Sequence, residues 1–181
     1  MNSFETFKHL HKNTSPLLIG NVWDVKSAEI FQANGFRAIG ISSQAISNAL
    51  GYPDGENLPF DELLHITKRI TDMVDIPLTV DMEAGYSRDL QGILENVEKL
   101  HDCGAVGINL EDTLPGEKRS LVPAASFTET VAKVTGHIKR KKLCLLKQGL
   151  VQGKLSCTCY MLYHMRDIQV NQQSLLVQMK R

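Results

Sequence analysis

The sequence predicts an α/β fold built on a parallel β-sheet, and three observations carry this prediction. Strand-like and helix-like segments alternate four and a half times along the 181 residues. The composition, 43% apolar and 22% charged, is that of a globular domain with a substantial core. Each distinctive polar cluster directly follows a predicted strand, and parallel α/β folds build their sites at these strand ends.

The first part of the chain contains three predicted helices and two predicted strands. Ser3 is expected to cap a helix that places Phe4, Phe7 and Leu10 along one face. Strands are predicted over 16–21 and 38–41. Helices are predicted over 26–34, where Asp24 is the expected cap, and over 44–50. The Gly and Pro content of residues 51–55 predicts a loop.

The same alternation continues after this loop. Asp61 is the expected cap of a helix that runs to residue 74, because its apolar positions follow a helical period. Further strands are predicted over 78–80, 106–110 and 143–146. Helices are predicted over 89–103 and 126–139, and residues 112–123 form a Pro-containing loop.

Charge and hydropathy exclude several classes of function. The 20 basic and 20 acidic residues cancel, so nothing indicates binding to nucleic acid or to an anionic membrane. No apolar run approaches the roughly 20 residues that span a bilayer. The polar N-terminal segment does not look like a signal peptide, and we therefore expect a cytoplasmic protein.

Acidic side chains end two successive predicted strands. Asp81 and Glu83 follow strand 78–80 and point to the same side, because side chains alternate along a strand. Glu111 ends the next strand. Carboxylates from neighbouring strands create the oxygen-rich environment that Mg²⁺ prefers. Exposed strand-end acids without a ligand are the plainer interpretation of the same residues.

Periodicity alone leaves the arrangement of the sheet open. Half of a closed (β/α)₈ barrel and an open doubly wound sheet give the same alternation. No Gly-x-Gly-x-x-Gly follows the first strand, so a dinucleotide site has little support.

Five motifs resemble those of the isocitrate lyase/phosphoenolpyruvate mutase family, in the family's order, within residues 4–142. They are Asn21-Val22-Trp23-Asp24, Ser42-Ser43, Gly51-Tyr52-Pro53-Asp54, Asp81-Met82-Glu83-Ala84-Gly85-Tyr86 and Gly107-Ile108-Asn109-Leu110-Glu111-Asp112. The resemblance implies the N-terminal half of a (β/α)₈ barrel. It also implies Mg²⁺ at the strand ends and chemistry at C–C or C–P bonds of 2-oxo acids or phosphonates, through an enolate.

The resemblance also implies roles for individual residues. Asp81 would be the acid nearest the metal, and Glu83 and Glu111 would reach the metal through water. Asp54 would be a catalytic acid that faces the metal and the substrate. Ser42, Ser43 and Asn109 would bind the substrate. Trp23 and Tyr86 are expected to pack without a chemical role.

Two departures from the family pattern narrow these implications. The loop 112–123 lacks the Lys-Arg-Cys-Gly-His segment of isocitrate and methylisocitrate lyases, and it lacks the Lys-x-Asn-Ser segment of true phosphoenolpyruvate mutases. The chain is therefore most similar to a mutase-like branch of the family whose substrates vary. A class II aldolase-like barrel would require histidine metal ligands at the strand ends, which the sequence does not place there.

The second departure is the tail. We expect a partial barrel over 1–142 and an aberrant segment over 143–181, because the strand–helix rhythm is lost there. Read one base out of frame, codons for Cys144 to Leu150 permit Phe-Val-x-Ala-Arg-Thr, which is similar to the family's next strand. We therefore expect a frameshifted or alternatively spliced tail. The parent protein, expected to be a homo-oligomer, would carry the lyase or mutase activity. A catalytically inactive truncated isoform, or a binding remnant, is the alternative for this chain.

Overall fold

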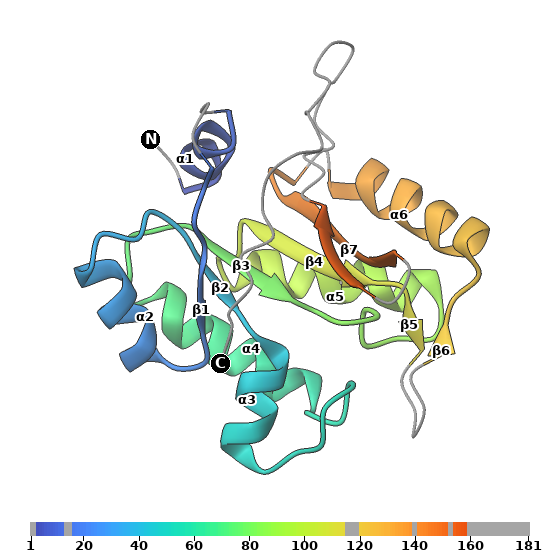
Figure 1. Cartoon of the computed structure of the whole chain (residues 1–181), viewed down its shortest axis with the longest axis horizontal. Helices are drawn as coiled ribbons and strands as arrows, with labels where there is room; N and C mark the ends of the chain where they lie inside the picture. Colours follow the sequence, from blue (N-terminus) through green and yellow to red (C-terminus); the bar gives the residue numbers. More distant parts are fainter. Residues whose placement is uncertain (1–2, 13–15, 115–119, 139–140, 152–153, 159–181) are drawn as a thin grey trace.

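The computed structural model describes residues 3–12, 16–114, 120–138, 141–151 and 154–158 of the chain (Figure 1). The helices are α1 (Ser3–Leu10), α2 (Val25–Ala33), α3 (Ser43–Leu50), α4 (Phe60–Thr71), α5 (Leu90–Asp102) and α6 (Ala124–Ile138). The strands are β1 (Gly20–Val22), β2 (Ile39–Ile41), β3 (Leu78–Asp81), β4 (Gly107–Glu111), β5 (Thr113–Leu114), β6 (Ser120–Leu121), β7 (Cys144–Val151) and β8 (Lys154–Thr158).

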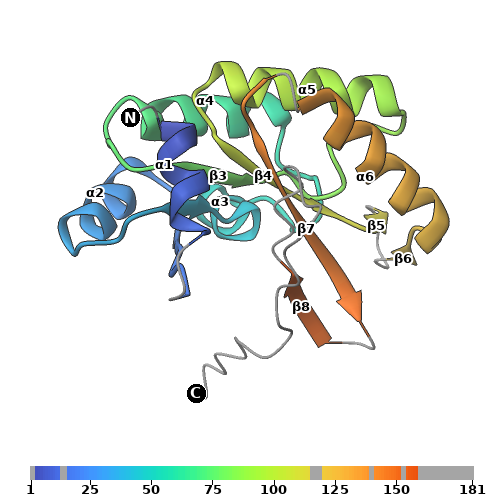
Figure 2. The same cartoon turned by 90° about the horizontal axis from the view of Figure 1, so that it is seen from above.

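Six strands form one sheet in the order β1-β2-β3-β4-β7-β8. The first five run parallel, as the alternation of strands and helices predicts. Residues Thr79, Gly107 and Cys144 are register partners, so the carboxyl ends of these strands lie at one edge of the sheet. Helices α4, α5 and α6 lie along one side of the strands (Figure 2).

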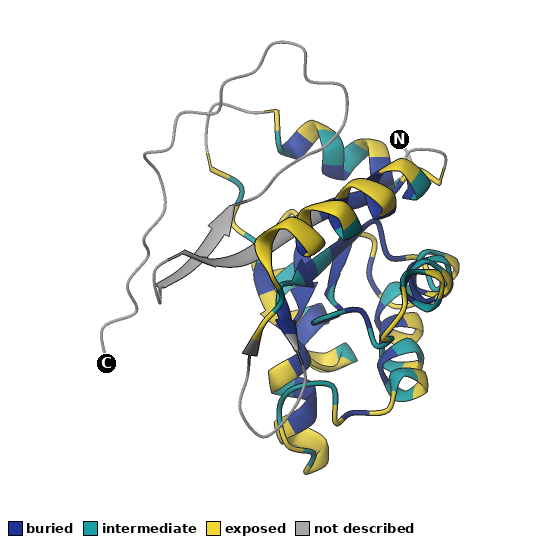
Figure 3. Ribbon diagram, turned by 90° about the vertical axis from the view of Figure 1, so that its right-hand side faces the viewer, coloured by how far each residue is buried: buried dark blue, intermediate teal, exposed yellow. Residues whose placement is uncertain are grey.

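The main core lies between the sheet and its helices. Alternate strand side chains are fully buried there, among them Val22, Ile39, Val80 and Ile108. The outward faces of the helices are exposed (Figure 3). Within the described ranges, no helix has the length and apolar character needed to cross a membrane.

A second, smaller core lies at the amino ends of the strands. Helix α1 buries Phe4, Phe7 and Leu10 against residues that precede or begin strands, including Ala38 and Cys144. The helix approaches the sheet closely because position 107 is a glycine: a Cβ added to Gly107 would lie 3.0 Å from Cε1 of Phe7. Helix α1 therefore covers one end of the sheet with apolar side chains.

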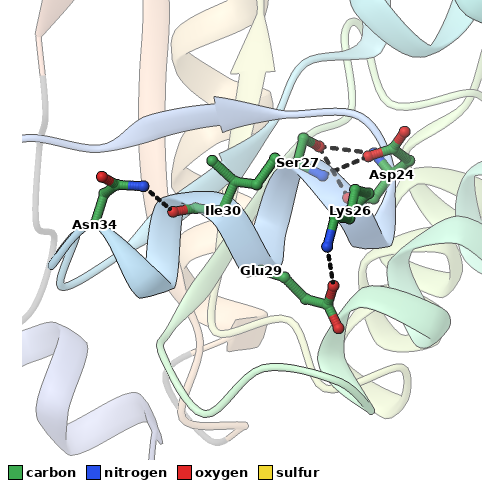
Figure 4. A network of polar contacts seen from close by, with 6 residues as sticks. All are labelled: Asp24, Lys26, Ser27, Glu29, Ile30 and Asn34. Carbon is green, nitrogen blue, oxygen red and sulfur yellow. Dashed lines mark hydrogen bonds and ion pairs between the residues drawn. The ribbon is translucent and has the colours of Figure 1, made fainter.

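Helix α2 shows how local sequence sets the element boundaries. The carboxylate of Asp24 accepts a hydrogen bond from the Ser27 amide at 2.6 Å, and the Ser27 hydroxyl accepts one from the Asp24 amide at 3.2 Å (Figure 4). This reciprocal capping box satisfies amides that have no partner inside the helix. The predicted cap is confirmed.

Several element boundaries are shifted, most of all at β1, which begins at Gly20 although a strand was predicted from residue 16. The structure also differs from the sequence predictions at three other places. Helix α4 begins after Pro59 without a side-chain cap, so the prediction that Asp61 caps it is wrong; Asp61 lies in the first turn, where it favours the helix dipole. The loop after β4 contains a short antiparallel pair, β5 and β6, that was not predicted.

The third difference concerns the segment after residue 142. The predicted strand 143–146 corresponds to β7, which is longer and pairs parallel with β4. Strand β8 then returns antiparallel to β7, and the two strands extend away from the helices (Figure 2). Residues 159–181 of the predicted tail lie outside the described residues, and the boundary at residue 142 stays a prediction.

Candidate functional site

The last residue of β3 is the centre of a polar cluster at the carboxyl ends of the strands. The side chain of Asp81 is half-buried and accepts two hydrogen bonds. The Ser43 hydroxyl donates to its Oδ2 at 3.0 Å, and the Glu83 amide donates to its Oδ1 at 3.1 Å. Both oxygens of Asp81 are thus held by neighbouring elements, which fixes the orientation of its carboxylate.

The loop 82–86 that follows β3, called here the acid loop, has an unusual backbone. Glu83 and Tyr86 adopt φ values of 48° and 55°, in the left-handed region that L-residues rarely occupy. Gly85 has φ 106°, and a Cβ there would approach the Ile93 side chain to 2.8 Å. The Asn96 amide group donates to the carbonyls of Gly85 and Tyr86 at 3.0 and 3.2 Å. Backbone strain of this kind persists at functional sites when the surroundings hold it in place.

Strand β4 delivers the next polar residues beside Asp81. Asn109 is the register partner of Asp81, and its Oδ1 accepts a hydrogen bond from the Thr79 hydroxyl at 3.4 Å. The amide of Glu111 donates to the carbonyl of Glu83 at 2.7 Å, and Thr113 donates to the Glu111 carboxylate at 3.1 Å. The main chains at Glu83 and Glu111 therefore lie side by side.

Mutual repulsion and burial change the protonation of these acids. Burial raises the pKa of Asp81 to about 6, and the nearby negative charge of Glu111 adds to the increase. Burial also raises the pKa of Glu83 to about 7, with further contributions from Asp81, Asp54 and Glu111. The side chain of Glu83 is only 3% exposed. The predicted metal acids and Asp54 are therefore close enough to interact electrostatically.

A second loop, residues 51–59 between α3 and α4, carries Asp54 and is called here the Asp54 loop. The Asn57 side chain donates to the carbonyl of Asp54 at 2.8 Å and to that of Gly55 at 3.4 Å. The carboxylate of Glu56 accepts a hydrogen bond from the amide of Tyr86 at 2.7 Å. Sequence reasoning missed Glu56, because an acid in an aperiodic loop carries no signal of a long-range contact.

The two predicted substrate-binding serines begin helix α3. The hydroxyl of Ser42 accepts from the Ala45 amide at 3.3 Å and caps the helix, whereas that of Ser43 donates to Asp81. The first amides of a helix have no partner within the helix and favour an anion at that end. Ser42 and Ser43 thus bring a helix N-terminus next to Asp81.

Tyr86 was expected only to pack. Its ring packs against Phe60, with the ring centroids 5.1 Å apart. Its hydroxyl is buried and has no hydrogen-bond partner among the described residues. Burial raises the pKa of this hydroxyl, and the negative charges of Glu83 and Glu56 raise it further, so the phenol stays protonated beside the acids.

The oxygen donors around Asp81 decide whether this site can hold the hard cation that the sequence implies. In the described part of the chain, no group of three or more His, Cys, Asp or Glu side chains is preassembled around a metal position. The oxygen Oε1 of Glu83 is nevertheless buried without a hydrogen-bond partner there. An all-oxygen set with one unpaired buried carboxylate oxygen fits Mg²⁺, which keeps several waters and takes one or two carboxylates.

Comparison with known proteins identifies the family. The family model described as phosphoenolpyruvate phosphomutase matches residues 7–146. An uncharacterized protein of Mycobacterium tuberculosis is 32% identical over 127 residues, covering 70% of this chain and 47% of the relative. An oxaloacetate decarboxylase of Paraburkholderia xenovorans is 32% identical over 124 residues, covering 66% of this chain and 41% of the relative. The chain spans about half the length of the curated relatives it matches.

Solved structures agree on the fold. A phosphonopyruvate hydrolase in complex with oxalate and Mg²⁺ superposes with a TM-score of 0.75 at 20% identity, covering 82% of this chain and 53% of the hydrolase. The five parallel strands and their helices therefore form part of a (β/α)₈ barrel. On the match to the family model, the chain belongs to the isocitrate lyase/phosphoenolpyruvate mutase family.

Proposed function

We propose that the parent of this chain is a Mg²⁺-dependent lyase or mutase. It acts at a C–C or C–P bond of a 2-oxo acid or a phosphonate and passes through an enolate. The observation that carries the proposal is the convergence of Asp81, Glu83, Glu111 and Asp54 in a buried place, where burial and then the neighbouring charges raise the pKa of Glu83 to about 7. Such crowding of acids is costly without a cation and becomes favourable with one.

Each residue has a role in this proposal. Asp81 holds the metal directly, and Glu83 and Glu111 hold its waters. A bound Mg²⁺ supplies Lewis-acid stabilisation for negative charge that develops on the 2-oxo acid.

The remaining residues act on the substrate. The amides and hydroxyls of Ser42 and Ser43 orient its carboxylate at the N-terminus of α3. Asn109 lies beside Asp81 and donates to a substrate oxygen, and Asp54 faces the reacting group. For the parent we also propose a cytoplasmic location and a homo-oligomeric assembly.

One observation favours the alternative that this chain is a catalytically inactive isoform or a binding remnant. Strand β8 pairs antiparallel with the outer side of β7, at the edge where a barrel continues with a parallel strand. We propose that the aberrant tail begins near residue 143 and accounts for this change. Sequencing the genomic locus tests the tail: a next reading frame that does not continue the family sequence would contradict it.

The metal site is tested by isothermal titration calorimetry on the full chain. Oxalate with Mg²⁺, the pair bound to the phosphonopyruvate hydrolase, serves as an enolate-like probe. We expect binding that requires both components and is lost in Asp81→Ala. Equal binding by the variant would remove the metal assignment. A panel of oxaloacetate, substituted malates and phosphonopyruvate with Mg²⁺ then separates the active chain from the inactive isoform.

A further inference from the structure

We propose that Glu56 is a positioning residue that fastens the Asp54 loop to the acid loop. The inference rests on the proposed function in one respect: the Asp54 loop is taken to face the substrate. Glu56 and Tyr86 are 30 residues apart in the sequence, yet the Tyr86 amide nitrogen lies 2.7 Å from the carboxylate oxygen Oε1 of Glu56. This contact joins the segment that carries Asp54 to the segment that carries Glu83.

The backbone geometry at the contact indicates that the contact is a specific feature of the fold and not an incidental one. Glu56 has φ 59°, and its partner Tyr86 has φ 55°. Two residues without the freedom of glycine thus adopt left-handed backbone where the loops meet. Such conformations are held against strain only by specific contacts. A hydrogen bond from an amide to a charged carboxylate is among the stronger contacts available for this purpose.

The surroundings of Glu56 favour an anchoring role over a role as another metal acid. Burial and the charge of Glu111 raise the pKa of its carboxyl above the ordinary value, and hydrogen bonds from the amides of Tyr86 and Ala84 and the charge of Arg88 offset part of this increase. The carboxylate is therefore stabilised by backbone amides of the acid loop. Packing of the Phe60 ring on Tyr86 closes the same junction from the α4 side.

The position of Glu56 is transmitted to Asp54 through a short piece of chain whose carbonyls share one hydrogen-bond donor. Only Gly55 separates Asp54 from Glu56, and Asn57 bridges the carbonyls of Asp54 and Gly55. Displacement of Glu56 from the Tyr86 amide would therefore move Asp54 relative to Asp81. We infer that Glu56 sets the distance across which these two acids act.

Three substitutions separate the effect of side-chain length at position 56 from the effect of its charge. Glu56→Ala removes both the acceptor and the charge, Glu56→Asp keeps the charge but shortens the side chain by one methylene, and Glu56→Gln keeps an acceptor at full length without the charge. Anchoring predicts that Ala and Asp lose the contact between the two loops and that Gln, which still reaches the Tyr86 amide, keeps part of it. A purely electrostatic role predicts that the Asp variant behaves like wild type and that the Gln and Ala variants lose the contact between the loops to the same extent.

Hydrogen exchange of the full-length chain without ligand gives the first readout. We expect amides of residues 52–58 and of Tyr86 to exchange about 10- to 100-fold faster in the Ala and Asp variants, as loss of a charge-assisted hydrogen bond implies. Glu56→Gln keeps a neutral hydrogen bond of about half the strength, so its exchange should lie between wild type and the Ala and Asp variants. The matched control is Glu95→Ala, because Glu95 is exposed on α5 and accepts a single hydrogen bond from Gln91 at 3.0 Å. Unchanged exchange in the Ala and Asp variants would overturn the proposal.

Titration of oxalate in the presence of Mg²⁺ gives the second readout. We expect the same order of variants, with about a tenfold or greater loss of affinity for Ala and Asp. If wild type binds oxalate and all three variants bind it equally, the positioning role is wrong while the proposed function stands. If wild type binds no oxalate, the proposed metal and substrate site does not operate in this chain, and the exchange data still decide whether Glu56 fastens the two loops. Circular dichroism identifies any variant that does not fold. If Glu56→Ala does not fold, the comparison of Glu56→Asp with Glu56→Gln decides whether the length or the charge of the side chain matters.

Discussion

The two ends of the parallel sheet are built from the same strands but have opposite chemistry. At the amino ends, α1 buries Phe4, Phe7 and Leu10 in an apolar cluster. At the carboxyl ends, partly and fully buried acids repel one another, and Glu83 and Tyr86 have left-handed backbone. Apolar packing closes the amino ends and fills the main core between the sheet and its helices, which lets the carboxyl ends hold the strain and repulsion that a cation site requires.

The largest expected effect is a loss of stability when an apolar side chain at the amino ends of the strands is removed. Phe7 is 0% exposed, and its replacement in Phe7→Ala leaves a cavity against Gly107 and the rest of the small cluster. We expect a loss of about 3–5 kcal/mol in the free energy of unfolding, a large part of the total for a domain of this size. Urea unfolding followed by circular dichroism measures this loss.

The control for this prediction is His9→Ala, which changes an exposed residue on the same helix. It should remain within about 0.5 kcal/mol of wild type. A similar loss for both variants would contradict the packing of Phe7 on the sheet as the source of the effect, because Ala favours helix formation at both positions.

A second prediction concerns the acidic end, where removing a charge should stabilise the protein. The folded state raises the pKa of Glu83 from 4.5 to about 7, so it binds the proton more tightly than the unfolded chain does. Stability without metal should therefore fall as pH rises from about 4.5 to about 7, by roughly 2–3 kcal/mol in total. Glu83→Gln should remove this loss and be more stable than wild type at pH 8, with little difference near pH 4.

Thermal melts across this pH range, with and without Mg²⁺, test the prediction. Mg²⁺ should stabilise wild type at pH 8 and reduce the advantage of Glu83→Gln. The exposed Glu95→Gln is the control and should show no such change with pH. A constant advantage of Glu83→Gln at every pH would contradict ionisation of the buried Glu83 beside other acids as its cause.

Sequence patterns predicted much of the fold because they record local physical chemistry. The capping signal at Asp24 located the start of α2, and helical periodicity located α4. The acids Asp81 and Glu111 were predicted to share one edge because strand ends in a parallel sheet must meet there. The structure places them in adjacent strands, within reach of electrostatic interaction.

The features that were missed depend on contacts between segments that are distant in sequence. The hydrogen bond from Ser43 to Asp81 spans 38 residues, and the one from Tyr86 to Glu56 spans 30. No periodicity encodes such pairs. The antiparallel return of β8 was missed for the same reason, because strand direction is set by pairing with β7.

The smallest expected effect compares two helix caps, and it separates structure from binding at the acidic end. Asp24 caps α2 and Ser42 caps α3, each with a side-chain oxygen on a helix amide. Asp24→Ala and Ser42→Ala should each lower the free energy of unfolding by about 1 kcal/mol, measured in urea. Only Ser42→Ala should also weaken the binding of oxalate with Mg²⁺, because α3 begins beside Asp81. Equal oxalate affinity in the two variants would reduce Ser42 to a structural cap and remove it from the proposed substrate site.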